Sequence, residues 1–417
     1  MSEHINNHSQ RQQVLKTLIR RLHEGETVEE VQADFARLLQ DVGATEVAEM
    51  EQALIGEGIS ETEVKRLCDV HVAVFRDSLD AQPAPESLPG HPVHTFRAEN
   101  AAVEGVLDEL VAAVAAVEAA PGMSAMGQVQ AGLRTLRQYE VHYLRKENIL
   151  FPYLEQEGFT GPSSVMWAIH DDIRAGWKAL DELFAVRPGD PRAFVQQLQK
   201  TLAPIETAIR EMCYKEEHIL FPAALEKLSD AQWAAIRAQE AEIGYAYVTP
   251  GKEWPPDELA AQVRDVAAPA TEAAAAGPIG LAGQAIPLAI GALTAEQINL
   301  LLTHLPVDVT FVDEHDQVRY FSDTRERIFP RSPAIIGRKV QLCHPPASVH
   351  RVQQILDDFR TGARDTAEFW IQSEGLFIHI RYFALRDRQG AYRGTLEVSQ
   401  ELSPLRALEG ERRLADE

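Results

Sequence analysis

The sequence lacks the excess of basic residues that would suit nucleic acid or an anionic membrane. Among its 417 residues, 63 are Asp or Glu and 40 are Lys or Arg, which gives a formal net charge of -23 at pH 7. Nucleic acids and anionic lipids attract clustered Lys and Arg, and no basic stripe offsets this acidic balance. We therefore expect no nucleic-acid partner, although peripheral association with a membrane stays open.

Long hydrophobic runs and paired cysteines are also missing. The first residues, MSEHINNHSQRQQ, are polar, and the apolar stretch at 279–293 is interrupted by Gly and Pro and is too short to span a bilayer. The three cysteines, Cys68, Cys213 and Cys343, are neither even in number nor clustered, unlike the disulfide framework of a secreted protein. These absences predict a soluble cytoplasmic protein without a transmembrane segment.

Enzyme signatures do not stand out either. The chain contains no nucleophile elbow, no Gly-rich phosphate loop and no zinc-protease motif. No kinase, cyclase or DNA-binding pattern follows the last strands. A binding or signalling role is therefore favoured over catalysis, while an enzymatic role stays open.

Length and composition predict several folded regions, because 417 residues exceed what one core normally organises. A Pro-rich boundary covers 81–92, and an Ala-, Pro- and Gly-rich linker covers 249–290. Helical periodicity dominates before the linker, and strand periodicity dominates after it. The predicted order is an all-α N-terminal domain at 10–80, a four-helix bundle at 90–230, the linker, an α+β domain at 293–402 and a helical tail at 403–417.

The last helix expected in the N-terminal region places Cys68 and His71 on one apolar face, together with Leu67 and Phe75. One interpretation is a satisfied buried histidine beside a small apolar cysteine. The other is a thiolate and imidazole pair that binds a metal or haem, which would need further ligands from elsewhere. Both interpretations stay open from the sequence.

A repeated segment marks the predicted bundle as the place to look for a binding site. YEVHYLRKENILFP at 139–152 is followed by EMCYKEEHILFP at 211–222, and aligning the two Ile-Leu-Phe-Pro sequences sets Lys146 on Glu216. Two similar long helices that carry His and Glu before an apolar ending are typical of a bundle with an internal two-fold repeat. The four helices of this bundle are expected at 96–117, 128–154, 163–184 and 191–225.

Polar residues on apolar helix faces point to a metal site in this bundle. His170 lies on an apolar stripe of the third predicted helix, Glu216 on one of the fourth, and Glu147 lies with Tyr143 and Leu150 on the second. Buried His and carboxylate groups are costly unless they pair with each other or with a cation. Inward-facing groups from several helices are what a metal site in a helical bundle requires.

Residues 90–228 resemble hemerythrin-like (HHE) cation-binding domains, through HYLRKENILFP, which begins at His142, and VMWAIHDDIR around His170. The resemblance implies a diiron centre held by His and carboxylate ligands, with His-x-x-x-Glu pairs on the second and fourth helices. The cofactor it implies is non-haem iron, and haem is the alternative.

The chain departs from this pattern at three positions that the family uses for ligands, namely Asn100, Lys146 and Met212. Glu147 does not simply replace Lys146, because on a straight helix it is turned by about 140° from His142. Either a bound metal or haem, or a bundle that has kept its shape and lost the ion, fits these departures.

The predicted metal ligands are His142, His170, Glu216 and Glu147. Residues in or near the predicted bundle or on the N-terminal helix supply further candidates, which are His91, His94, Glu217, Cys68 and His71, with Glu99 and His218 nearby.

The flanking regions also resemble known families. LCDVHVAVF at 67–75 and GHPVHTFRAEN at 90–100 resemble a domain of unknown function that precedes HHE domains. LPVDVTFVDEHDQVRYFSD at 305–323, CHPPASVHRVQQIL at 343–356 and IRYFALRDRQGAYRGTLEV at 380–398 resemble a PAS domain. PAS domains commonly pair, so this resemblance implies a homodimer with a further signalling partner of unknown identity.

The pattern of the PAS-like region predicts two strands, a helix at 349–360 and three more strands. Cys343, His344 and His350 are candidate ligands for a bound group, because thiolate and imidazole are the usual donors to haem iron. The alternative is a plain His-Pro-Pro turn that opens the helix. The strands are expected at 307–312, 318–321, 368–372, 377–385 and 392–400.

Three functions fit these observations. The first is a sensory or regulatory protein whose bundle binds iron, another metal or haem and responds to O2, NO or redox state. Its PAS domain would transmit the signal through a C-terminal helix at 402–414. The second is an iron-handling or iron-centre repair protein that uses Cys68, and the third is a scaffold without a cofactor.

Overall fold

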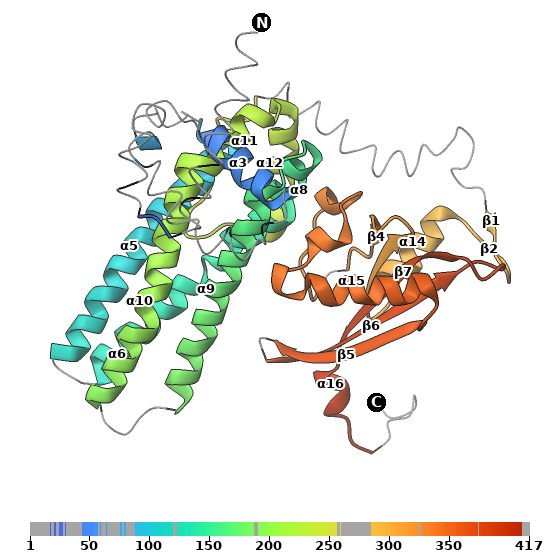
Figure 1. Cartoon of the computed structure of the whole chain (residues 1–417). Coiled ribbons are helices and arrows are strands. Elements are labelled where there is room, and N and C mark those ends of the chain that lie inside the picture. The colour runs from blue at the N-terminus through green and yellow to red at the C-terminus, as the bar shows by residue number, and fades with distance from the viewer. Residues whose placement is uncertain are drawn as a thin grey trace, which may run out of the picture. The chain divides into compact units, whose positions relative to one another are not determined.

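The computed structural model contains two compact units, Met1–Val263 and Arg264–Glu417 (Figure 1). The structure describes only part of the predicted N-terminal domain, chiefly residues 44–56, and most of the predicted linker lies outside the described residues. The structure describes residues 44–56, 88–119, 123–186, 191–256, 285–324, 327–373 and 375–410, with isolated positions at 17, 21, 25–27, 30, 59, 64, 76, 79, 80 and 259.

The first unit is helical and contains the predicted bundle. In Figure 1, α5, α6, α9 and α10 run alongside one another; α5 packs on α6 and α10, and α9 packs on α10. The helices are α3 (Ala44–Gly56), α5 (Pro92–Ala119), α6 (Met123–Arg137), α7 (Glu140–Arg145), α8 (Phe151–Gln156), α9 (Gly161–Val186), α10 (Pro191–Lys215), α11 (Phe221–Lys227) and α12 (Asp230–Ile243), with π-helical segments η1 (Lys146–Leu150) and η2 (Glu216–Leu220).

The four-helix bundle is confirmed, with one correction and one addition. The helix predicted at 128–154 is interrupted at Gln138 and Tyr139, where a turn separates α6 from α7. The added helix, α12, packs against α5, α7 and η1. It begins with a capping box in which Ser229 and Gln232 satisfy each other's backbone N–H groups.

Both repeated segments widen into a π-helical turn just before their proline. The N–H of Phe151 donates to the carbonyl of Lys146, and the N–H of Phe221 donates to the carbonyl of Glu216, five residues back in each case. Proline has no N–H, and its ring crowds the carbonyl four residues earlier. A wider turn relieves this crowding, so each helix continues through its Phe-Pro pair.

The second unit has the predicted α+β fold. Its five-stranded antiparallel sheet has the order β4-β3-β7-β6-β5, and the helix α15 (Pro346–Thr361) separates the second strand from the third. All five predicted strands are confirmed, because runs rich in β-branched and aromatic residues mark them clearly. The strands are β3 (Asp308–Asp313), β4 (Val318–Phe321), β5 (Thr366–Ser373), β6 (Leu376–Arg386) and β7 (Tyr392–Glu401).

Short elements surround this sheet. The predicted C-terminal helix is much shorter than expected, because α16 (Ser403–Arg406) ends before a non-helical segment at 407–410. Within the described part of the chain, no helix is both long and apolar enough to span a bilayer. The remaining elements are the hairpin β1 (Ile286–Pro287) and β2 (Ala292–Leu293), the helix α14 (Ala295–His304), and the 3₁₀ turns η3 (Pro333–Ile335) and η4 (Val340–Cys343).

Candidate metal centre

The structure brings the four predicted metal ligands together in the interior of the bundle. His142 comes from α7, Glu147 from η1, His170 from α9 and Glu216 from η2. His142, His170 and Glu216 are fully buried, and Glu147 is 2% exposed. These side chains come from three separate stretches of the chain, α7 with η1, α9 and η2, and the bundle packing makes them neighbours.

Each of the two histidines has an outer carboxylate partner. Nδ1 of His142 lies 2.8 Å from an oxygen of Glu99, and Nδ1 of His170 lies 2.7 Å from an oxygen of Glu147. Such a carboxylate fixes the ring orientation and directs Nε2 of each histidine toward the centre. Burial, with Lys146 and Arg174 nearby, holds the pKa of His170 well below its usual value, so this imidazole is neutral.

The side chain of Lys146 occupies the point where these groups converge. Its ammonium group is hydrogen-bonded to one carboxylate oxygen of Glu216 and lies 3.0 Å from Nε2 of His170. The other oxygen of Glu216 lies 3.0 Å from Nε2 of His142. Equivalent positions of the sequence repeat thus carry opposite charges, and they form a fully buried ion pair.

The charges in this pair affect each other's protonation. Burial alone would raise the pKa of Glu216, but Lys146 and His142 more than offset this effect and lower the pKa to about 2. Burial lowers the pKa of Lys146, and the carboxylate of Glu216 opposes this shift. The carboxyl group is therefore ionised at neutral pH and retains its ion-pair partner.

Two arginines pair with the outer carboxylates. Arg145 is hydrogen-bonded to Glu99, which also accepts a 2.7 Å hydrogen bond from the backbone N–H of Ala246. Arg174 donates a 2.9 Å hydrogen bond to Glu147. Burial raises the pKa of Glu147 to about 7 even though Arg174 opposes this shift.

The residues present do not fit a metal ion in this arrangement. Across the described ranges, no group of three or more His, Cys, Asp or Glu side chains is placed to hold one. Lys146 already supplies a cation between Glu216 and His170. At the other departures from the family pattern, Asn100 accepts a 2.6 Å hydrogen bond from the hydroxyl of Tyr139, and Met212 is fully buried in the apolar core.

Among the further candidates, His91 lies in a separate aromatic cluster. Its ring centroid is 4.9 Å from that of Trp233 and 4.5 Å from that of Trp254, and its Nδ1 accepts a hydrogen bond from the N–H of Val93. Burial lowers its pKa to about 4, although Asp230 opposes this shift. His91 is therefore a neutral, packed side chain in the described structure.

The other candidates in the bundle are less buried. His94 and Glu217 are half-buried. His218 is hydrogen-bonded to the carbonyl of Tyr214. Cys68 and His71 lie outside the described residues, so their proposed role stays a prediction.

The PAS ligand candidates have different environments. The thiol of Cys343 is buried at the end of η4 and lies 3.7 Å from the carbonyl of Lys339, to which it donates. Burial lowers the pKa of His344 to about 4, with Arg331 adding to this effect. His350 is exposed on α15.

Several residues of the buried network were missed from the sequence. Arg145 lies three residues after His142, and Arg174 lies four residues after His170. Helical spacing places each arginine beside a predicted ligand and could have indicated both. Glu240 and the loop at Ala246 lie beyond the C-terminal end of the predicted bundle. The one sequence signal for a further helix there is the capping pair Ser229 and Gln232.

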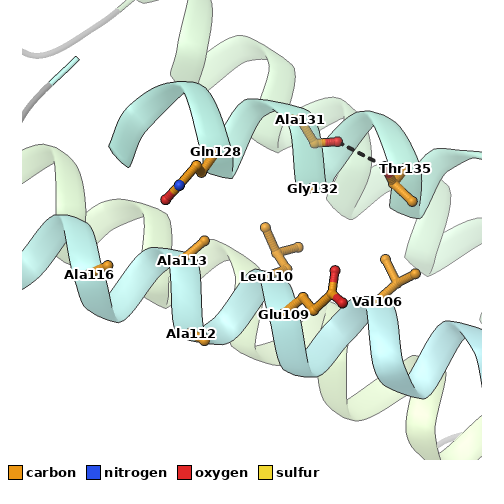
Figure 2. A pocket seen from close by; sticks show the side chains of 10 residues that line it. All are labelled: Val106, Glu109, Leu110, Ala112, Ala113, Ala116, Gln128, Ala131, Gly132 and Thr135. Atoms are coloured by element: carbon orange, nitrogen blue, oxygen red, sulfur yellow. Dashed lines mark hydrogen bonds between the residues drawn. The ribbon is translucent and has the colours of Figure 1, made fainter. Parts of the chain in front are cut away.

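A groove of about 530 Å³ lies between α5 and α6. Figure 2 shows that small side chains such as Ala113 and Ala131 line it, together with Leu110 and Glu109. Glu109 is its one acidic residue, and no histidine or cysteine lines it. This groove therefore offers no set of metal ligands.

Three family models match the chain, in the order predicted. Residues 15–81 match a family of unknown function (DUF438), residues 91–224 match the hemerythrin HHE cation binding domain, and residues 298–403 match a PAS domain.

Solved structures similar to this chain include a C-terminal domain and two sensor histidine kinase structures. The C-terminal domain of a protein from Streptococcus mutans is 39% identical over 30% of this chain and 98% of that chain, with a TM-score of 0.29. A sensory box sensor histidine kinase from Vibrio cholerae is 9% identical over 25% and 87%, with a TM-score of 0.20. The sensor region of a sensor histidine kinase is 14% identical over 24% and 40%, with a TM-score of 0.19. A comparison with curated proteins found no match.

Proposed function

Because the chain joins a hemerythrin HHE bundle to a PAS domain, we propose that it is a sensory or regulatory protein. The bundle is its input module, and the PAS domain transmits the signal and pairs two copies of the chain. Family resemblance is an analogy between folds, and structural features of each unit support this role directly.

The observation that carries this proposal is the exposed apolar surface of the PAS unit. The helix α14 contains no fully buried residue, yet Leu300 and Leu301 are 49% and 57% exposed on it, and Leu305 follows at its end. On β5, Trp370 is 62% exposed. Large exposed apolar side chains on α14 and on β5 suit interaction surfaces, which supports pairing through this unit.

The buried network of the bundle is suited to an input role. It connects α5, α7, η1, α9 and η2 through buried side chains. A change at one group would leave a buried charge without its partner, and the helices that carry the network would have to adjust.

The nature of the input stays a prediction. A response to O2, NO or redox state through iron or haem requires a coloured protein whose absorption spectrum changes with the gas. Iron handling requires loss of activity in Cys68→Ala. Neither chemistry is supported by the arrangement around Lys146, and the proposal that we make for this protein does not depend on a resident iron.

The oligomeric state of the full chain tests the transmission role. Sedimentation equilibrium should give a dimer for the wild type and a shift toward monomer for Leu301→Glu, because a charge at an apolar interface is costly. Glu296→Ala, at an exposed polar position of the same helix, should leave the dimer intact. A monomeric wild type, or a Leu301→Glu protein that dimerises as tightly as the wild type, would contradict pairing through α14.

A further inference from the structure

We propose that Lys146 is a built-in replacement for a metal ion, so that the centre of the bundle is complete without one. The proposal concerns the centre itself and is independent of how the PAS domain pairs. It departs from the cation-binding role of the family that residues 91–224 match.

The geometry around the ammonium group resembles that around a bound cation. One carboxylate oxygen of Glu216 and one imidazole nitrogen of His170 accept hydrogen bonds from it. The ring of Tyr143 covers a third side of the ammonium group, with its centroid 4.9 Å from Nζ. An ammonium group has three donors and is stabilised over an aromatic ring, so this enclosure suits Lys146.

The charges of the centre are already balanced. Each buried or half-buried cation has at least one carboxylate partner, and the two histidines are held by carboxylates at Nδ1. A divalent ion added to this set would bring two uncompensated charges into the buried interior of the bundle, which is costly. The three ion pairs are Lys146 with Glu216, Arg145 with Glu99, and Arg174 with Glu147.

Displacement of Lys146 by a metal would also cost free energy. The side chain is fully buried, and its ammonium group would need a new partner or an exit to solvent. The donor set left behind would be His142, His170 and the single carboxylate Glu216. The network therefore favours the lysine over the metal, because the buried ammonium group would lose its carboxylate partner.

One substitution should convert the centre into a metal site. Lys146→Glu would remove the internal cation and add a carboxylate at the point where His142, His170 and Glu216 converge. Two imidazoles and two carboxylates suit Fe²⁺, Co²⁺ or Zn²⁺. The outer carboxylates Glu99 and Glu147 would already hold the histidines in place.

The test is a Co²⁺ titration of the full chain, purified without a histidine tag, followed by visible absorption and thermal unfolding. Lys146→Glu should bind Co²⁺ with visible ligand-field bands and a raised Tm. Its affinity for Co²⁺ should exceed that of the wild type by at least ~100-fold. Loss of one outer partner of a metal ligand weakens metal binding by up to about 100-fold, and the variant gains a direct ligand. Lys178→Glu makes the same charge change at an exposed position of α9 and should behave as the wild type does.

Two results would overturn the proposal. One is a wild type that co-purifies with iron which disappears in His170→Ala. The other is a folded Lys146→Glu protein that binds Co²⁺ no more tightly than the wild type. If Lys146→Glu does not fold, the wild type decides: an unchanged Tm in chelator and in Co²⁺ supports the proposal, and a Tm that falls in chelator refutes it. None of these outcomes changes the oligomeric state, so the two proposals fail separately.

Discussion

At the scale of single residues, Lys146 and Glu216 show how a buried pair can define a centre without adding much net stability. Removing two charges from water costs several kcal/mol for each ion, and the attraction between them only offsets this cost when their other hydrogen bonds are made. Here His170 and His142 make those bonds. The pair therefore specifies one arrangement of the helices more than it strengthens the fold.

Glu240 is a buried carboxyl with poorer partners than Glu216. Its oxygens lie 4.0 Å from Nη1 of Arg145 and 3.8 Å from Nη1 of Arg237, and neither oxygen accepts a hydrogen bond from any residue that the structure describes. Burial raises its pKa from the ordinary value of 4.5 to about 7, although both arginines oppose this shift. The ionised form is the unfavourable one in the folded protein.

This raised pKa predicts a pH dependence of stability. The folded protein holds the proton of Glu240 more tightly than the unfolded chain, so the stability linked to it is fully present below pH 4.5 and is lost as the pH rises through 7. Urea unfolding at pH 5 and pH 8 should show a loss for the wild type that is smaller in Glu240→Gln by about 2 to 3 kcal/mol. The raised pKa of Glu147 preserves part of the pH dependence of stability in this variant. Identical losses in both proteins would contradict a raised pKa at Glu240.

At the scale of elements, the two π-helical segments are the structural form of the sequence repeat. In each, a wide turn begins at the residue that carries a charge into the centre, which is Lys146 in η1 and Glu216 in η2. The next residue in η1, Glu147, binds His170 from the other side. Short π segments inside helices often occur at functional sites, and here they position both members of the central ion pair.

The contact between α9 and α10 depends on a glycine. A Cβ atom at Gly176 would lie 2.5 Å from Cγ1 of Ile205, closer than real Cβ contacts allow, whereas a Cβ atom at Gly105 on α5 would meet nothing within 4 Å. Both glycines lie inside helices, where alanine is intrinsically favoured by up to about 1 kcal/mol.

The same substitution should therefore have opposite effects at these two positions. Gly176→Ala should lower the free energy of unfolding by about 1 to 3 kcal/mol, because Ile205 must shift in a packed core. Gly105→Ala should raise it by about 0.5 to 1 kcal/mol. Chemical denaturation of the two variants measures both values. A stabilising Gly176→Ala would show that α9 and α10 are not held at this close distance.

At the scale of the whole molecule, a sensory role requires that the bundle and the PAS unit influence each other energetically. Glu147→Gln weakens the outer support of His170 without changing side-chain size. In the full chain it should alter hydrogen exchange of PAS amides by about fivefold or more, the lower range of coupling between linked sites. Gly105→Ala, away from the network, should leave PAS exchange unchanged. Changes confined to the bundle would contradict communication between the two units.

Much of this organisation was predictable from the sequence. Short runs rich in β-branched and aromatic residues located every strand of the five-stranded sheet, and helical periodicity with the repeated Ile-Leu-Phe-Pro segments located the bundle. The apolar stripes identified His170, Glu216 and Glu147 as buried, because a polar residue at a core-facing position must be buried whatever its partner is. Departures from the family pattern at Asn100 and Lys146 were also visible.

What those residues bind was decided only by the tertiary structure. A stripe shows which face of a helix is buried but not which group lies opposite, so the pairing of Lys146 with Glu216 and the support from Glu99 could not be read from spacing. The π turns changed the angles expected for a straight helix. Because a buried charge needs a partner across helices that are distant in sequence, the choice between a metal ion and a lysine depended on how those helices pack.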